Sequence, residues 1–153
     1  MPAKKLKEFL DSEKVKYLTI GHSVAYTAQE IAASAHIPGQ DLAKTVVVKL
    51  DGEMVLAVLP ATARVDLELL RKASGAKSAE LARENEFAGI FPGCELGAMP
   101  PFGNLYGLEV FVAQRLTEDE QIAFNAGTHT ELIQLSFADF ERLVRPRVLK
   151  LSA

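Results

Sequence analysis

Apolar residues recur along this chain at two spacings, and the spacing changes from one segment to the next. Helical spacing, with apolar positions three or four residues apart, is seen at Leu6, Phe9 and Leu10. Other segments are runs of β-branched and aliphatic residues bounded by glycine or proline, a pattern typical of strands. These patterns predict helices over residues 3–14, 27–38, 65–74, 78–86 and 136–145, and strands over residues 17–20, 43–50, 53–59, 108–113, 121–126 and 130–135.

The most clearly defined unit is a β-hairpin over residues 43–59. Its two strands are joined by Asp51-Gly52, a dipeptide that favours the two-residue type I′ turn because both positions need a positive φ. The strands are apolar at successive positions, for example at Val46, Val47 and Val48. We therefore expect the hairpin to lie in the middle of the structure, covered on both faces.

Capping residues mark several of the predicted helix ends. Thr-x-x-Glu sequences at Thr27 and Thr117 are capping boxes, the second opening only a short helix, and Ser136 caps the last helix. Gly75 is expected to end the helix over residues 65–74. Strands that pair locally and then alternate with helices predict the α/β (α+β) class, with a mixed, barrel-like β-sheet surrounded by helices in a single domain over residues 1–153.

Composition limits the classes of protein to which the chain can belong. Its 153 residues are the size of one domain, and no apolar run approaches the length of a membrane span. A net charge of −3 argues against a DNA- or RNA-binding protein that relies on many phosphate contacts. A single cysteine, Cys94, and a charged N-terminal segment without the apolar core of a signal peptide favour a cytoplasmic protein.

Residues 89–107 are rich in glycine and proline. The glycines are Gly89, Gly93, Gly97, Gly103 and Gly107, and the prolines are Pro92, Pro100 and Pro101. Glycine lets another molecule approach the main chain, and proline stiffens the chain, so such a loop can present backbone N–H groups to a ligand oxygen. Composition alone favours a plain connection between strands. The case for a ligand-binding loop therefore depends on the rest of the chain.

Lys44 and His129 are the side chains best suited to chemistry. Lys44 shares a strand face with Val46 and Val48, from which its ammonium can reach an adjoining pocket as a positive charge; the alternative is a strand-end lysine that reaches water. His129 follows Gly127 in a turn, where it can donate to a ligand oxygen or move protons near neutral pH. A histidine exposed on a surface turn is the alternative there.

Other candidate residues carry weaker signals. His22 follows a strand end and could face the same cleft, whereas Cys94 is either a small core residue or a nucleophile. No two histidines stand at metal-ligand spacing with cysteine or carboxylates, so we predict no metal site. The chain also lacks a Gly-x-Ser-x-Gly elbow, a Walker A loop and a dinucleotide fingerprint, which argues against the enzymes built on those motifs.

Three short segments carry a more specific signal through their order and spacing. They are Ala-Lys-Thr-Val-Val-Val-Lys at 43–49, Gly-Ala-Met-Pro-Pro-Phe-Gly at 97–103 and Phe-Asn-Ala-Gly-Thr-His at 124–129. With them the chain resembles, over residues 22–143, the YbaK/prolyl-tRNA synthetase-associated domain family. Members of this family are free-standing relatives of the editing domain inserted in bacterial prolyl-tRNA synthetases.

The resemblance implies an α/β fold with a mixed, barrel-like sheet, and hydrolysis of the ester that links a wrong amino acid to the terminal adenosine of tRNA. It implies that Lys44 is the functional side chain, that the loop from Gly97 to Pro101 lines the pocket and that the turn at Gly127 closes it. Thr45 stands where some relatives have Asn. The site residues expected on this basis are His22, Lys44, Thr45, Gly97, Ala98, Met99, Pro100, Pro101, Phe102, Gly127, Thr128 and His129.

An aminoacyl ester is already activated, so a water must be placed and an oxyanion stabilised, with little covalent machinery. The vicinal ribose hydroxyl of the substrate can organise that water, as is implied for relatives. The sequence at 97–103 is most similar to that of members that act on small amino acids, such as alanine, serine, threonine or cysteine. We expect no cofactor, no contact with DNA or membrane, the aminoacyl-tRNA acceptor end as partner, and a monomer or weak homodimer.

Two other functions are compatible with the sequence. One is a non-catalytic regulatory module that binds a nucleotide or an aminoacyl-adenosine-like ligand in the same pocket. The other is a thiol hydrolase built on Cys94 with His129.

Overall fold

The computed structural model describes residues 2–21, 41–95 and 97–152. The predicted helix over 27–38 and the candidate site residue His22 lie outside these ranges. The described helices are α1 (Pro2–Ser12), α3 (Leu67–Ser74), α4 (Glu84–Phe87) and α5 (Phe137–Val144), with 3₁₀ helices η2 (Gly103–Leu105) and η3 (Gln114–Glu118). Within these ranges, no helix combines the length and the apolar composition that crossing a membrane would require.

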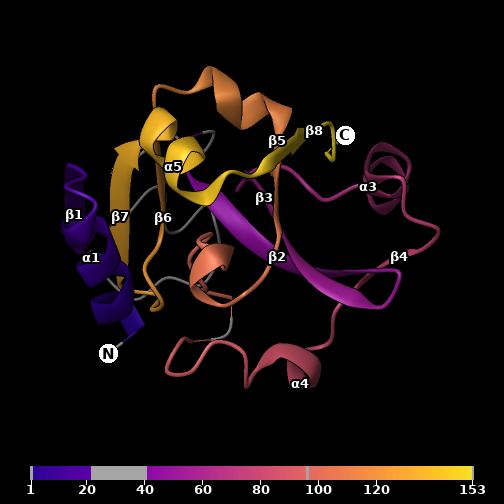
Figure 1. Ribbon diagram of the computed structural model, residues 1–153, viewed down its shortest axis with the longest axis horizontal. Helices are drawn as coiled ribbons and strands as arrows, with labels where there is room; N and C mark the ends of the chain where they lie inside the picture. The colour runs from indigo at the N-terminus through magenta and orange to yellow at the C-terminus, as the bar shows by residue number, and fades with distance from the viewer. Residues whose placement is uncertain (1, 22–40, 96, 153) are drawn as a thin grey trace.

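The described strands form two sheets (Figure 1). The strands are β1 (Tyr17–Gly21), β2 (Ala43–Leu50), β3 (Glu53–Pro60), β4 (Ala79–Leu81), β5 (Val110–Ala113), β6 (Gln121–Asn125), β7 (Glu131–Ser136) and β8 (Arg147–Leu149). One sheet has the antiparallel order β1-β7-β6, and the other has the order β4-β2-β3-β5-β8 with parallel pairs β3–β5 and β5–β8. The predicted α/β class with a mixed sheet is confirmed, but the described strands divide into two sheets and do not close a barrel.

The predicted hairpin is confirmed as β2 and β3. Its register is regular from the pair Ala43–Pro60 to the pair Leu50–Glu53. The turn residues Asp51 and Gly52 have φ values of 51° and 85°, the positive pair that a type I′ turn requires. The hairpin therefore follows local sequence preferences throughout.

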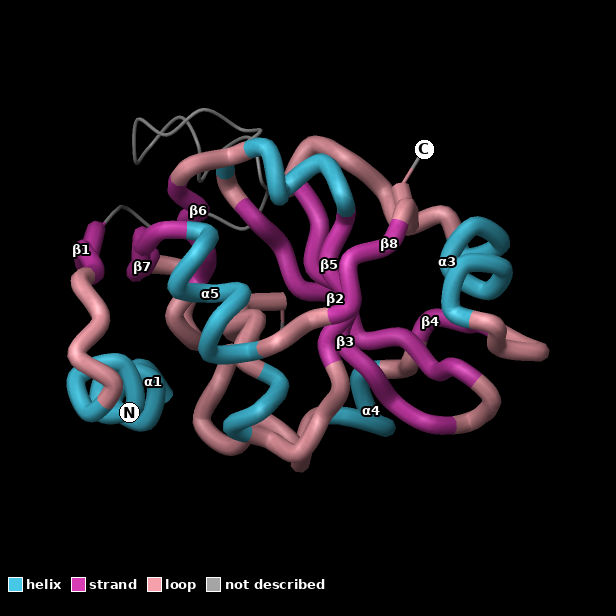
Figure 2. The backbone as a smooth tube through the Cα atoms, turned by 45° about the horizontal axis from the view of Figure 1, so that its top comes forward, coloured by secondary structure: helices cyan, strands magenta, loops and turns pink. Residues whose placement is uncertain are grey.

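Both faces of the hairpin are buried, as predicted. On one face, Val47, Leu56 and Val58 belong to an apolar cluster that also contains residues of α1, β6 and β7. On the other face, Val48 and Leu59 pack in a second cluster with residues of α3 and β5. Figure 2 shows the corresponding arrangement, with α1 beside β1 at one end of the molecule and α3 beside β4 at the other. The hairpin thus contributes residues to both clusters, as does β5.

The predicted helix over residues 78–86 is wrong. Residues 79–81 form β4, which pairs with the end of β2, and α4 is a single turn over Glu84–Phe87. The carboxylate of Asp51 accepts hydrogen bonds from the backbone N–H groups of Lys77 and Ser78, at 2.9 Å each. These bonds direct the chain onto the edge of β2. Here tertiary pairing overrides the helical preference of an Ala-Glu-Leu sequence.

The caps were predicted with mixed success. Thr117 does not begin a helix; it lies within η3, and its hydroxyl donates to the carbonyl of Gln114 at 2.6 Å. The cap at Ser136 is confirmed, because its hydroxyl oxygen accepts a hydrogen bond from the N–H of Asp139 at 3.1 Å. Gly75 ends α3 with a φ of 80°, as predicted. The other strands are confirmed with ends shifted by one or two residues.

Gly103 is packed more tightly than Gly89, Gly97 and Gly107. A β-carbon added there would lie 2.5 Å from the carbonyl oxygen of Leu108 and 2.7 Å from Cγ2 of Val110. The carbonyl of Gly103 also accepts hydrogen bonds from the N–H groups of Tyr106 and Leu108, at 2.9 Å each. The chain therefore folds back on itself at this position, and only glycine fits.

We expect Gly103→Ala to lower the free energy of unfolding by about 1–3 kcal/mol, because the methyl group would overlap backbone atoms that cannot move independently. Denaturant unfolding measures this change. Gly89→Ala is the matched control, since no heavy atom lies within 4 Å of a β-carbon added there. Its effect should stay within about 0.5 kcal/mol. Equal losses in the two variants would contradict the packing argument.

Candidate functional site

Two segments that are distant in sequence are joined by backbone hydrogen bonds. We call them the glycine–proline loop (residues 89–107) and the histidine turn (residues 126–130). The N–H of Glu95 donates to the carbonyl of Gly127 at 2.8 Å, and the N–H of Gly127 donates to the carbonyl of Ala98 at 2.9 Å. As a result, a β-carbon added to Gly97 would lie 3.5 Å from Cε1 of His129. The structure therefore brings together two of the predicted site regions.

Glycines make this pairing possible. Gly97 and Gly127 have φ values of 83° and 96°, in the left-handed region that residues with a β-carbon rarely adopt. Gly97 is exposed, whereas Gly127 and His129 are buried. The accessible part of the paired segments thus includes bare main chain at Gly97, next to the buried imidazole of His129.

The residues that follow Gly97 mainly support the loop from inside. Their side chains are buried at five consecutive positions, Ala98, Met99, Pro100, Pro101 and Phe102. The ring of Phe102 packs against Phe9, Phe124 and Phe140, with centroid distances of 6.2, 5.6 and 5.5 Å. Of the other predicted site residues, Thr45 and Thr128 are partly exposed. The five buried residues hold the loop in place, and Gly97 is the member of this run that faces solvent.

Lys44 lies at the start of β2, close to the strand that leads into the histidine turn. Leu42 forms a parallel bridge with Ala123 of β6, and β6 ends at Asn125, just before the turn. Strand alternation places Lys44 on the face of Val46 and Val48, as predicted. Met99 and Phe102 pack with Ala43 and Val47 on the opposite face. The side chain of Lys44 therefore leaves the strand on the face away from these buried residues of the loop.

The charge of Lys44 is held in an unfavourable setting. Partial burial of the amine lowers its pKa from the ordinary value of 10.5, and the positive charge of Arg64 lowers it further. Arg64 follows the end of β3 and is exposed. Two cations thus lie near each other at one end of the five-stranded sheet, where an anionic ligand would be attracted.

Glu95 belongs to this candidate site by its contacts with His129, although the sequence patterns did not indicate it. Its carboxylate oxygen Oε2 accepts a hydrogen bond from the N–H of His129 at 3.1 Å and lies 3.8 Å from Nε2 of the same residue. Two features of the sequence could have indicated it: it is the single charged residue between Gly89 and Gly107, and it stands two positions before Gly97. The contact itself joins residues 34 positions apart, which local patterns do not reveal.

Cys94 is poorly suited to act as a nucleophile. It is half-buried, and burial raises the pKa of its thiol above the ordinary value. Its sulfur lies 3.9 Å from the hydroxyl oxygen of Tyr106. Because the thiolate is the reactive form of cysteine, a raised pKa lowers reactivity at neutral pH. In the part of the chain that is described, no group of three or more His, Cys, Asp or Glu residues could hold a metal ion.

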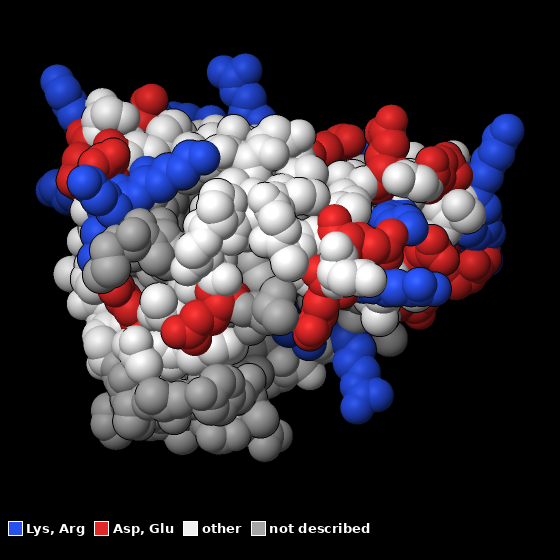
Figure 3. Space-filling model, turned by 90° about the horizontal axis from the view of Figure 1, so that it is seen from below, with Lys and Arg blue, Asp and Glu red and all other residues white. Residues whose placement is uncertain are grey.

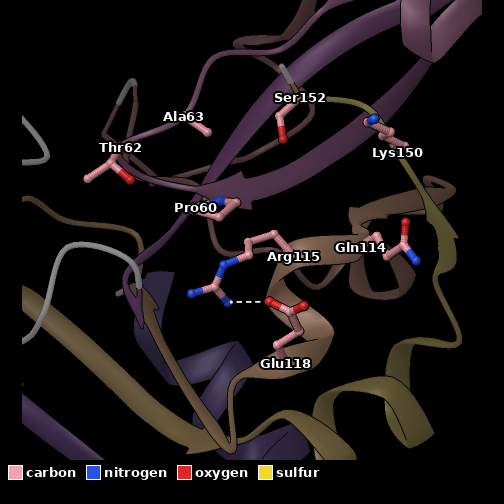
Figure 4. Close-up of a pocket in the computed structure, with 8 residues that line it drawn as sticks. All are labelled: Pro60, Thr62, Ala63, Gln114, Arg115, Glu118, Lys150 and Ser152. Atoms are coloured by element: carbon pink, nitrogen blue, oxygen red, sulfur yellow. Dashed lines mark ion pairs between the residues drawn. The ribbon is translucent and has the colours of Figure 1, made fainter.

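A separate cavity of about 600 Å³ opens near the ends of β3 and β5 (Figure 4). Its described lining residues are Pro60, Thr62, Ala63, Gln114, Arg115, Glu118, Lys150 and Ser152. Arg115 and Glu118, both on η3, form an ion pair of 3.0 Å. None of the predicted site residues that the structure describes is among these lining residues, so this cavity does not coincide with the loop and turn.

On the face seen from below (Figure 3), the charged side chains of the described residues are of both signs. Figure 3, which views the molecule from below, shows lysine and arginine side chains interspersed with acidic ones around an uncharged middle region. This agrees with the net charge of −3. The described residues on the face shown in Figure 3 thus form no extended basic patch of the kind that binds long stretches of nucleic acid.

Comparisons with solved structures identify the fold. The structure of hypothetical protein APE2540 superposes with a TM-score of 0.86 at 20% identity, covering 97% of this chain and 99% of that one. A proposed trans-editing enzyme for prolyl-tRNA synthetase superposes with a TM-score of 0.84 at 19% identity, covering 99% of this chain and 97% of the other. At these identities the similarity establishes the fold alone.

Sequence comparisons identify the family. The multifunctional Ser/Thr-tRNA deacylase ProXp-y of Escherichia coli strain K12 is 35% identical over 112 residues, which cover 70% of this chain and 66% of that protein. The match thus spans slightly less than two thirds of the relative's length. The family model of the aminoacyl-tRNA editing domain matches residues 22–143, the range of the resemblance seen in the sequence. The chain therefore belongs to the aminoacyl-tRNA editing domain family.

Proposed function

We propose that this protein is an aminoacyl-tRNA deacylase, which hydrolyses the ester between a small amino acid and the terminal adenosine of a mischarged tRNA. The observation that carries the proposal is the close approach of exposed Gly97 to His129, held by the hydrogen bonds between Glu95, Ala98 and Gly127. Membership of the editing-domain family supports the same function. In the reaction, water adds to the ester carbonyl, and the products are the free amino acid and the tRNA with its ribose hydroxyl restored.

Gly97 is the best candidate to stabilise the oxyanion with its backbone. The N–H groups of Ala98 and Gly127 already donate within the fold, to the carbonyls of Glu95 and Ala98. Gly97 is exposed, and its lack of a side chain lets a substrate approach the main chain. One preorganised donor of this kind lowers the reaction barrier by roughly 3–4 kcal/mol. His129, beside it, is placed to donate to a substrate oxygen or to relay a proton.

Lys44 lies two residues after Leu42, which bridges Ala123 of β6, the strand that leads into the histidine turn. The substrate brings a phosphate next to its terminal ribose, and an oxyanion forms at the ester as water adds. Either anion would stabilise the ammonium of Lys44, whose charge is otherwise disfavoured by burial and by Arg64. We therefore assign to Lys44 the binding of an anionic substrate group, which agrees with the role that the family resemblance implies.

A small amino acid is favoured by the packing around Gly97. Ala98 and Met99 follow it in the chain and are almost completely buried, so the core fixes the main chain beside Gly97, which would yield little to a larger amino acid. Rejection by size is more effective than attraction, because one methylene changes binding by only about 1–3 kcal/mol. The relative named as a Ser/Thr-tRNA deacylase makes serine and threonine esters the first substrates to test.

The decisive test is deacylation of a panel of tRNAs charged with alanine, serine, threonine, cysteine and a larger amino acid. We expect turnover of at least one small aminoacyl ester and none of the larger one. A non-hydrolysable aminoacyl-adenosine analogue is assayed for binding in parallel. Binding of the analogue without hydrolysis of any ester would refute the deacylase and identify a non-catalytic binding module.

Replacement of Lys44 by alanine should lower the deacylation rate by about a hundredfold, because the transition state would lose a nearby positive charge. Lys49→Ala is the matched control. It removes a lysine from the same strand, but that lysine is paired with Glu86 at 2.7 Å and Glu80 at 3.3 Å, and it should leave the rate unchanged. An unchanged rate in Lys44→Ala would remove Lys44 from the mechanism.

The same two lysines should affect stability in opposite directions. The folded-state pKa of Lys44 is lowered, so its positive charge destabilises the folded protein at neutral pH. This loss of stability disappears as the pH rises through the folded-state pKa and the amine loses its proton. The pKa of Lys49 is raised by its hydrogen bonds to Glu86 and Glu80, so its charge is stabilising below its unfolded-state pKa. Thermal unfolding at pH 7 should show a higher Tm for Lys44→Met and a lower Tm for Lys49→Met. Shifts of the same sign would contradict the electrostatic assignment.

Cys94→Ser should retain full deacylase activity. A half-buried thiol with a raised pKa is not expected to be the attacking group, and serine preserves its size and its contact with Tyr106. The measurement is the deacylation rate before and after treatment of the wild type with a thiol-alkylating reagent, alongside the variant. Loss of activity in the serine variant, with an unchanged Tm, would support the alternative that the protein is a thiol hydrolase with Cys94 as nucleophile.

A further inference from the structure

We propose that Glu95 is a positioning residue, which acts in the reaction by fixing the backbone and the imidazole of His129. The inference rests on the proposed deacylase function, since it assigns a role within the same site. Glu95 is the one charged residue in the sequence of the glycine–proline loop. Its side chain is half exposed, yet its carboxylate is turned towards a buried residue of the histidine turn.

A single carboxylate oxygen faces His129 at two points. Oε2 of Glu95 accepts the hydrogen bond from the N–H of His129 at 3.1 Å, and the same oxygen lies 3.8 Å from Nε2 of the ring. Hydrogen bonds to a charged acceptor are about twice as strong as neutral ones. Glu95 therefore restrains both the main chain and one edge of the ring.

Gly97, another residue of the loop, lies near the same edge of the imidazole. A β-carbon on Gly97 would lie 3.5 Å from Cε1 and 3.9 Å from Nε2 of His129, and the histidine as a whole is only 7% exposed. Exposed main chain at Gly97, the half-exposed carboxylate and Nε2 thus converge. This is the edge at which a substrate would reach His129, so the direction of the ring there decides its contact with the reacting group.

The side chain of Glu95 can be changed without breaking the pairing of the two segments. The bonds from Glu95 N–H to Gly127 and from Gly127 N–H to Ala98 use backbone atoms only. Glu95→Ala should therefore fold, while releasing the N–H of His129 and the edge of its ring. Glu95→Gln keeps an oxygen that can accept the hydrogen bond, and it serves as the conservative variant.

A double-mutant cycle tests whether Glu95 acts through His129. Rates are measured for wild type, Glu95→Ala, His129→Ala and the double variant on the aminoacyl-tRNA that the wild type hydrolyses fastest. We expect Glu95→Ala to lower kcat roughly ten- to a hundredfold with little change in KM, as a small misplacement of a reacting group does. Glu95→Gln should recover most of this loss. In the His129→Ala background, Glu95→Ala should have no further effect, because residues that act through one another are not additive.

The proposal is overturned if the fold-losses in rate of the two single variants multiply in the double variant. It is also overturned if Glu95→Ala keeps full activity, or if His129→Ala is active and Glu95→Ala is not. Glu109→Ala is the matched control. Glu109 is exposed to a similar extent, 55% against 50% for the side chain of Glu95, and it lies 3.9 Å from Arg147. It should leave kcat unchanged.

Amide hydrogen exchange supplies a readout that does not depend on activity. The N–H of His129 should exchange faster in Glu95→Ala than in the wild type and stay protected in Glu95→Gln, at an unchanged Tm. Equal protection in the alanine variant would overturn the proposal. If the wild type hydrolyses no ester, the deacylase function fails, whereas the exchange rates still decide whether Glu95 holds His129.

Discussion

The hydrogen bonds exchanged between Glu95, Gly127 and Ala98 are the constraint on which the site depends. Each bond contributes only about 1 kcal/mol net, but breaking it would leave buried polar groups unsatisfied, at about 1–3 kcal/mol each. Ala98 and Gly127 are almost completely buried, so water cannot readily replace the lost partners. The cost of separation therefore holds Gly97 near His129, although neither residue lies in a helix or a strand.

The loop can form these bonds because the core holds its other end. Phe102 packs against Phe124 and Phe140, and Phe9 of α1 reaches the same ring. The ammonium of Lys5, also on α1, donates to the carbonyl of Leu105 at 2.8 Å. The family match begins at residue 22, after α1. An element outside the matched range thus helps to fix the position of the loop.

Features set by neighbouring residues were predictable from the sequence, and features set by distant residues were not. Asp51-Gly52 specifies its own turn, and the hairpin follows from it. The strand at 79–81 depends on Asp51, whose carboxylate accepts hydrogen bonds from N–H groups 26 and 27 positions further along the chain. Helical propensity does not reflect such a distant contact, so the helix predicted there was wrong. The loop and turn were found as motifs, but neither motif indicates that Glu95 joins them. The strand face on which Lys44 lies was predictable from the alternation of side chains along a strand. That Met99 packs against the opposite face was seen only in the three-dimensional structure.

Folding places the positive charges of Lys44 and Arg64 near each other without an anion to balance that of Lys44 among the described residues. Burial and a neighbouring cation both oppose the charge of Lys44, and no carboxylate in the described residues offsets them in setting its pKa. An anion placed near both cations would reverse this balance by favouring the charged amine. A substrate with a phosphate beside its reacting ester carries such an anion. On the function proposed above, binding would stabilise the lysine in the same step that positions the ester, and the unfavourable charge of the free protein would then serve substrate recognition.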